Sequence, residues 1–260
     1  MASAVADYGE TGGMDTLDTA LAAQFDRIDF LGGLRETTFF ELEDGATSFV
    51  DDLALDPLGA SALSEHAITA TAELLQSARV LAVRDAPSAV SAFALLRAAL
   101  EASCAAIWLL EPDDRDERMR RALRRHWSDL VEAEAMSRAL TGVAPDRGTD
   151  WARAHARWFV GVAPDAARAP VDPAATVAAA AEVVEAFTEV PGAAAIITSG
   201  WAGFGSVAIA RHPADGEMFA GSLSMVLDVA ETAISLFHAR AVAGSQLPDD
   251  AAALAHLRSR

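Results

Sequence analysis

The residues from Ser88 to Leu110 constrain the fold more than any other part of this sequence. In this stretch of helix-forming residues, Arg97 and Glu101 are the only side chains expected to be charged. A helix that is apolar on every side is usually surrounded by other helices. The stretch is long enough to span a bilayer, but each central charge would cost roughly 2.5 to 3.5 kcal/mol there. We therefore expect the central helix of a soluble protein and no membrane span.

The rest of the sequence indicates an all-α protein. Alanine supplies 60 of the 260 residues, and alternation of β-branched residues is almost absent. We expect an antiparallel helical bundle of about six to eight helices in one domain at residues 16–245. An acidic, flexible N-terminus at 1–15 would precede it, and a C-terminal tail or short helix at 246–260 would follow. Long alanine-rich faces offer more apolar surface than one bundle buries, so we expect a homodimer.

Apolar residues three and four positions apart, together with glycine and proline at the ends, indicate where the helices lie. Asp172 and Pro173 are typical of a helix start. Residues 36–56 and 193–210 are ambiguous, although the first segment favours a short helix. The predicted helices cover residues 16–31, 60–83, 88–110, 113–140, 151–160, 173–190 and 217–243.

Charge and cysteine usage restrict the compartment and the partners. The chain has 38 carboxylates and 20 arginines, no lysine, and a net charge of -18. Such a charge repels phosphate backbones, so we expect no nucleic-acid partner. One cysteine, Cys104, excludes a disulfide within the chain, and the N-terminus lacks a secretory signal pattern. These features predict a cytoplasmic protein without cofactors, and the absence of lysine and asparagine indicates a GC-rich genome such as an actinobacterial one.

The pair Arg97 and Glu101 is the strongest candidate for a functional site. A spacing of four places both side chains on one helix face, with Trp108 on the same face. We expect the pair to be buried, which costs several kcal/mol per ion unless hydrogen bonds or a ligand complete it. One interpretation is a structural ion pair between helices. The other is a central polar pocket where Arg97 anchors a small anionic ligand, or Glu101 acts as a base, beside Trp108. The leading functional hypothesis is non-enzymatic binding of a ligand or a partner.

Six arginines lie between Arg115 and Arg125, directly after a group of acidic residues. Acids in the first turn of a helix complement its dipole. We expect an inward face followed by a solvated arginine face, which could alternatively bind anions or a partner. The inward residues are Met119, Leu123, His126 and Leu130, and the outward residues are Arg118, Arg121, Arg124 and Arg125.

A first enzymatic alternative is a ribonuclease. Arg121 and His126 have the R-x4-H spacing of HEPN ribonucleases, which are all-helical and cleave RNA at a dimer interface. Five residues rotate about 140° on a continuous helix, so the two side chains should diverge. Ala122 also stands where HEPN sites usually carry a polar residue.

A second enzymatic alternative is a class I terpene cyclase. Asp113, Asp114 and Glu117 match the DDxxE pattern that binds Mg2+ in these all-α enzymes. The second metal-binding motif of that class is missing from the sequence. Pro112 also suits a helix start, where acidic residues are common. We therefore expect no metal site.

Three further features have structural interpretations. His66 is expected to be a core histidine. Glu231 and His238 lie seven apart at the edge of an apolar stripe, without the Glu-x-x-His pattern of di-iron bundles. The glycine-rich run Gly200–Ser206 does not match a nucleotide-binding fingerprint, which favours a tight aromatic turn.

The segments Leu95–Glu101, Trp108–Leu110 and Glu117–Arg121 resemble a group of uncharacterised actinobacterial helical proteins. Their shared pattern is L-R-x-x-L-E, then W-L-L, then E-R-x-R-R. That group is distantly similar to HEPN domains and occurs in stress and phage-defence contexts. The resemblance implies a helical fold, the association of Arg97 with Glu101, and a ribonuclease role as the alternative. Ser199, Gly200 and Trp201 stand where these relatives often have a serine followed by His-Gly.

Overall fold

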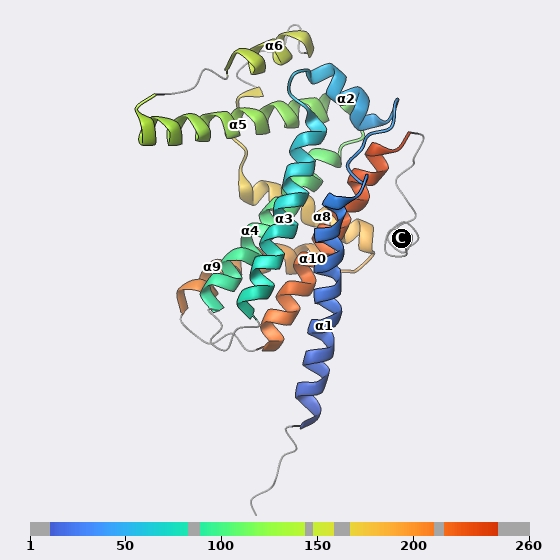
Figure 1. Ribbon diagram of the computed structural model, residues 1–260, viewed down its shortest axis with the longest axis vertical. Helices are drawn as coiled ribbons and strands as arrows, with labels where there is room; N and C mark the ends of the chain where they lie inside the picture. The colour runs from blue at the N-terminus through green and yellow to red at the C-terminus, as the bar shows by residue number, and fades with distance from the viewer. Residues whose placement is uncertain (1–10, 83–88, 144–147, 159–166, 211–215, 244–260) are drawn as a thin grey trace, which may run out of the picture.

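The computed structural model describes residues 11–82, 89–143, 148–158, 167–210 and 216–243. All regular secondary structure in these ranges is helical, which confirms the predicted all-α bundle (Figure 1). The elements are α1 (Thr11–Gly33), the 3-10 helix η1 (Leu34–Glu36), α2 (Thr47–Leu55), α3 (Ala60–Ala82), α4 (Ala89–Leu110), α5 (Arg115–Thr141), α6 (Gly148–Trp158), α8 (Pro173–Thr188), α9 (Ala193–Ala210) and α10 (Gly216–Ala241).

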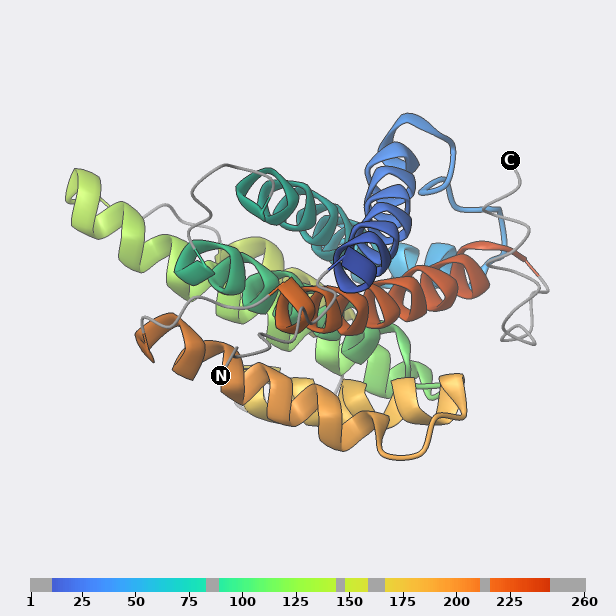
Figure 2. The same cartoon turned by 90° about the horizontal axis from the view of Figure 1, so that it is seen from below.

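Helices α4 and α10 form the middle layer of the bundle. Figure 2 shows α1 and α3 on one side of this layer and α8 and α9 on the other. Leu96, Leu100 and Ile107 of α4 are completely buried. By length and apolar composition alone, two stretches of the described helices could cross a membrane, Ser91–Leu110 and Glu217–Ala241, and 56% and 72% of them are buried inside the protein. Such burial is expected of core helices.

Local capping signals explain several helix ends. The carboxylate of Asp172 accepts a hydrogen bond from the backbone N–H of Ala174 and caps α8, as the sequence predicts. Asp114 caps α5 in the same way. At the other end of α5, Gly142 adopts a left-handed conformation with φ of 75°, which a glycine adopts without steric cost.

The two ambiguous segments contain helices α2 and α9. The prediction of a tight turn at Gly200–Ser206 is wrong, because these residues continue helix α9. A glycine inside a helix costs roughly 1 kcal/mol relative to alanine, which packing can offset. A Cβ atom on Gly200 would lie 2.8 Å from Met225 Cε of α10, so the absence of a side chain permits this close approach.

A smaller apolar cluster lies at one end of the main core. Leu55 of α2, Leu109 of α4, Met119 and Leu123 of α5, and Trp151 of α6 are buried in it. Helix α5 therefore crosses the end of the bundle, and its C-terminal half extends away from the other helices (Figure 1). This crossing leaves a space between α5, α4 and the chain that leads into α8.

Candidate functional site

The predicted pair of Arg97 and Glu101 forms, but it is not enclosed. Arg97 Nε lies 3.0 Å from Glu101 Oε1, and the two side chains remain 37% and 38% exposed. One residue of α9 covers the pair: Trp201 Nε1 donates a hydrogen bond of 2.7 Å to Glu101 Oε1, and the Arg97 guanidinium lies 4.7 Å from the Trp201 ring centre. The predicted burial is wrong, because more than a third of each side chain stays exposed beside Trp201.

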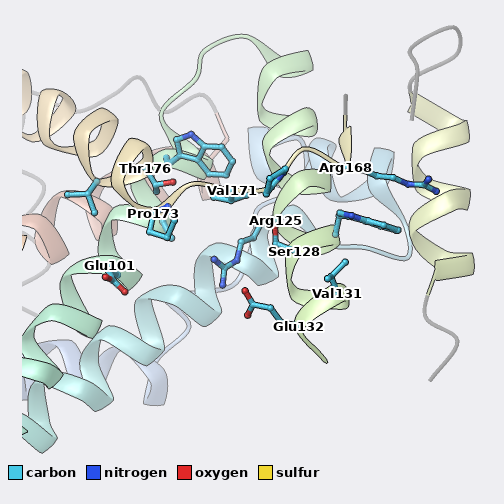
Figure 3. Close-up of a pocket in the computed structure, with 14 residues that line it drawn as sticks. Glu101, Arg125, Ser128, Val131, Glu132, Arg168, Val171, Pro173 and Thr176 are labelled. Carbon is cyan, nitrogen blue, oxygen red and sulfur yellow. The ribbon is translucent and has the colours of Figure 1, made fainter. Parts of the chain in front are cut away.

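Beside this pair lies a cleft between α4, α5 and residues 168–177 (Figure 3). Its volume is about 320 Å3. Glu101 and Trp108 line the cleft, whereas Arg97 does not and reaches it only through Glu101. The residues that line it are Glu101, Ala105, Trp108, Arg125, Trp127, Ser128, Val131, Glu132, Arg168, Pro170, Val171, Pro173, Thr176 and Val177.

Arg125 supplies a positive charge to the middle of the cleft. Its guanidinium points into the space between Glu101 and Glu132 (Figure 3). Asp129 holds this guanidinium from one side, with 3.3 Å from Nε to Oδ2 and 3.0 Å from Nη2 to Oδ1. The carboxylate of Glu132 is exposed. The middle of the cleft therefore contains groups of both charges.

Arg168 supplies the second positive charge and differs from Arg125 in its environment. Its guanidinium lies 4.5 Å from the ring centre of Trp127 and 4.9 Å from that of Trp151. The side chain is exposed, and no carboxylate of the described residues pairs with it. Cation–π contacts hold the position of a guanidinium while its N–H donors remain available. No local sequence pattern marks this residue, because its aromatic partners come from α5 and α6.

The arginine cluster of α5 does not form the predicted solvated face. Met119 and Leu123 are buried as predicted, but Arg118 is also buried. Its Nε donates to Asp51 Oδ2 at 2.7 Å, and its Nη1 donates to the carbonyls of Pro112 and Asp113. The prediction failed because α2 packs onto the start of α5 and turns its outward side into an interface.

Arg121 and His126 do not meet in this chain. Arg121 Nη1 donates to the carbonyl of Trp108 at 2.6 Å, and its Nε bonds to Glu117. The ring of His126 instead lies 3.3 Å from the carbonyl oxygen of Gly59, where burial lowers the pKa of the imidazole. The divergence of the two side chains agrees with the helix geometry, and an RNA-cleaving pair would require a second copy of the chain.

The three carboxylates of the DDxxE pattern have separate partners. Asp113 accepts a hydrogen bond of 2.8 Å from Arg240 Nη2, Asp114 caps α5, and Glu117 pairs with Arg120 and Arg121. In the described part of the chain, no group of three or more His, Cys, Asp or Glu side chains could hold a metal ion. These carboxylates stabilise the beginning of α5.

The remaining residues singled out in the sequence, His66, Glu231 and His238, lie outside the lining of the cleft. The prediction of a core position for His66 is wrong, because its side chain is exposed. Glu231 is buried and accepts a hydrogen bond of 2.8 Å from Arg27 Nε, which links α10 to α1. His238 stacks on Phe39 with ring centres 6.2 Å apart.

No protein family, curated protein or solved structure matches this chain. The resemblance to actinobacterial HEPN-like proteins therefore stays a prediction.

Proposed function

We propose that the protein acts by binding a small ligand that has an anionic group and an apolar body, in the cleft between α4, α5 and residues 168–177. The observation that carries this proposal is the guanidinium of Arg168. Arg168 is one of the residues that line the cleft; its guanidinium points toward α6 (Figure 3), is held by two indole rings, and has no carboxylate partner in the described chain. A guanidinium in this arrangement suits bidentate recognition of a carboxylate, sulfonate or phosphate group.

The walls and the volume of the cleft restrict the ligand further. Small-molecule sites typically have volumes of about 300 to 1,000 Å3, and this cleft of about 320 Å3 lies at the lower limit. Trp108, Val171 and Pro173 provide apolar surface beside the polar groups. A ligand with one ring system and one anionic group matches these dimensions.

Arg97 has an indirect role in this proposal. Arg97 and Trp201 both donate to the same oxygen of Glu101, Oε1, and so fix the orientation of that carboxylate at the edge of the cleft. Glu101 then discourages an anion at its own end of the cleft and directs the anionic group toward Arg168. In this proposal, Arg97 acts by holding the carboxylate of Glu101 in a fixed orientation.

The experiment titrates the protein with 2-naphthoate, using the neutral 2-naphthol as the comparison, and follows Kd by calorimetry and Tm by thermal unfolding. We expect the Arg168→Gln variant to bind naphthoate about tenfold more weakly, since a charge-assisted hydrogen bond contributes roughly 1.5 to 3 kcal/mol. Arg138→Gln removes the same charge from an exposed position on α5 and should leave Kd unchanged. Equal affinities of all three proteins, or no binding to the wild type, would refute the proposal.

The Arg97→Met variant separates binding from scaffolding. If Arg97 orients Glu101, this variant should keep its fold and lose part of the Tm increase that naphthoate produces. A variant that fails to fold would identify the pair as structural. The Trp201→Phe variant, which removes the hydrogen bond to Glu101 and keeps an aromatic ring beside Arg97, then provides the independent measurement of Kd.

A further inference from the structure

A second cavity lies at the opposite side of α10 from α8, where the C-terminal ends of α1 and α10 meet. Its volume is about 540 Å3, and it is separate from the cleft of the proposed function. Residues 37–43, which connect η1 to α2, form one of its walls. The lining residues are Phe30, Gly33, Leu34, Thr37, Thr38, Phe39, Glu41, Glu43, His238, Ala241 and Val242.

The apolar wall of this cavity is built on a group of packed aromatic rings. Phe39 lies 5.0 Å from Phe40 and 5.7 Å from Phe237 between ring centres, and it stacks on His238. Phe237 is completely buried, so it anchors this group to the core. Phe39 and Phe30 are only half-buried and line the cavity. Their rings offer the faces that attract a cation.

The rim of the cavity carries negative charge. Glu41 is exposed, and its carboxylate has no hydrogen-bonding or ionic partner in the described residues. Glu43 is anchored at the end of α10, because its N–H donates to the carbonyl of Ala241 and its Oε2 accepts from the N–H of Ala243. The C-terminal end of a helix also carries a partial negative charge, to which the last carbonyls of α10 contribute.

Positive side chains near the cavity are engaged elsewhere. Arg35 pairs with Glu73 of α3, and Arg240 binds Asp113 and the carbonyls at the end of α4. No arginine lines the cavity. No guanidinium therefore offsets the negative rim within the cavity lining, and the net charge of -18 adds long-range attraction for cations.

We propose that this cavity binds a small organic cation, an ammonium or quaternary ammonium compound with an aromatic or aliphatic body. The cationic group would lie over Phe39 within reach of Glu41 and Glu43, and the apolar body would contact Phe30 and Leu34. This site takes the opposite charge to the cleft beside Arg168. The two sites are consequently distinguishable by the charge of the ligand.

The test is a calorimetric titration of the full chain with benzyltrimethylammonium, with benzyl alcohol as the neutral comparison. The double variant Glu41→Gln with Glu43→Gln should weaken binding of the cation about tenfold. Glutamine at 43 keeps an acceptor for the N–H of Ala243, so the fold should persist, and an unchanged Tm would verify this. The Arg168→Gln variant should bind the cation with unchanged affinity.

The matched control is the double variant Glu36→Gln with Asp44→Asn. It changes the net charge by the same amount in the same segment, but neither residue lines the cavity. We expect less than a twofold change in Kd. Equal weakening in both double variants would show general electrostatic attraction without a site. Unchanged affinity in the Glu41/Glu43 variant, or equal affinity for benzyl alcohol, would likewise overturn the proposal.

Discussion

The buried ion pair of this fold joins Asp51 and Arg118, two residues that are far apart in the sequence. Their side chains are 5% and 8% exposed, respectively, and Arg115 also reaches Asp51 Oδ1 at 3.2 Å. The pair expected to be buried, Arg97 with Glu101, is half-exposed instead. A spacing of four residues predicts that two side chains meet, and that prediction is confirmed. The spacing does not predict which other parts of the chain cover the two side chains.

Replacement of Asp51 by asparagine should destabilise the protein strongly. The change leaves the guanidinium of Arg118 buried without its counter-ion, and breaking a buried pair in this way costs about 3 to 5 kcal/mol. Urea denaturation measures the loss in the free energy of unfolding. The exposed pair of Arg35 and Glu73 provides the control, because Glu73→Gln should cost less than about 1 kcal/mol. Similar costs for both variants would contradict the importance of burial.

His126 should make stability depend on pH. Burial lowers the pKa of this imidazole below its ordinary value of 6.5, so the unfolded chain takes up a proton at a higher pH than the folded protein. The contribution of His126 to the free energy of unfolding is therefore fully present above pH 6.5. It is lost as the pH falls from 6.5 through the lower pKa of the imidazole in the folded protein.

The measurement compares urea unfolding at several pH values for the wild type and for His126→Gln. Glutamine does not titrate, so the variant should lose this part of the pH dependence. The His66→Gln variant is the control, since it makes the same side-chain change at an exposed position on α3. If His126→Gln retains the full pH dependence, other groups are responsible.

At the scale of elements, local chemistry predicts where helices begin and end, but it does not predict which face of a helix is buried. The start of α8 at Pro173 and the start of α3 at Ala60 agree with the sequence predictions, because caps and helix breakers act through neighbouring residues. The sequence predicts that the face of α5 that carries Arg118 is solvated, but the contact of this face with α2 is set by a distant part of the chain. The glycines of α9 favour a turn when only the local sequence is considered, but Gly200 lies inside the helix, where it allows the close approach of Met225.

The N-cap of α8 gives a test at this scale. Asp172→Ala removes the acceptor for the N–H of Ala174 and should lower the free energy of unfolding by about 1 kcal/mol. Glu182→Ala, an exposed position within the same helix, also removes an acidic side chain, but it should change stability by less than about 0.5 kcal/mol. Thermal or urea unfolding of both variants compares the two costs. Equal costs would indicate that charge, not capping, stabilises α8.

At the scale of the whole molecule, the structure leaves apolar side chains exposed on the distal half of α5. Met136 and Leu140 are 63% and 78% exposed on the part of α5 that extends away from the bundle (Figure 1), and Val143, just after the end of this helix, is 66% exposed. Neighbouring exposed apolar residues of this kind are typical of interaction surfaces. The homodimer predicted from the sequence is best tested on this surface.

If two copies associate through the distal half of α5, the double variant Met136→Glu with Leu140→Glu should be monomeric. Analytical ultracentrifugation over a range of protein concentrations measures the molecular mass. Val80→Glu, a change of another exposed apolar residue on α3, should leave the association unchanged. A monomeric wild type would contradict the predicted homodimer.

The sequence by itself determined the helical class, the central position of the helix at residues 89–110, several helix ends and the meeting of Arg97 with Glu101. All of these depend on neighbours within one or two helical turns, where periodicity and capping act. Tertiary structure decided what is buried and what lines the cavities: Asp51 under Arg118, Arg168 between Trp127 and Trp151, and Glu41 beside Phe39. Each of these arrangements joins residues from different elements, and the crossing of those elements, not the local pattern, sets the environment of every charge.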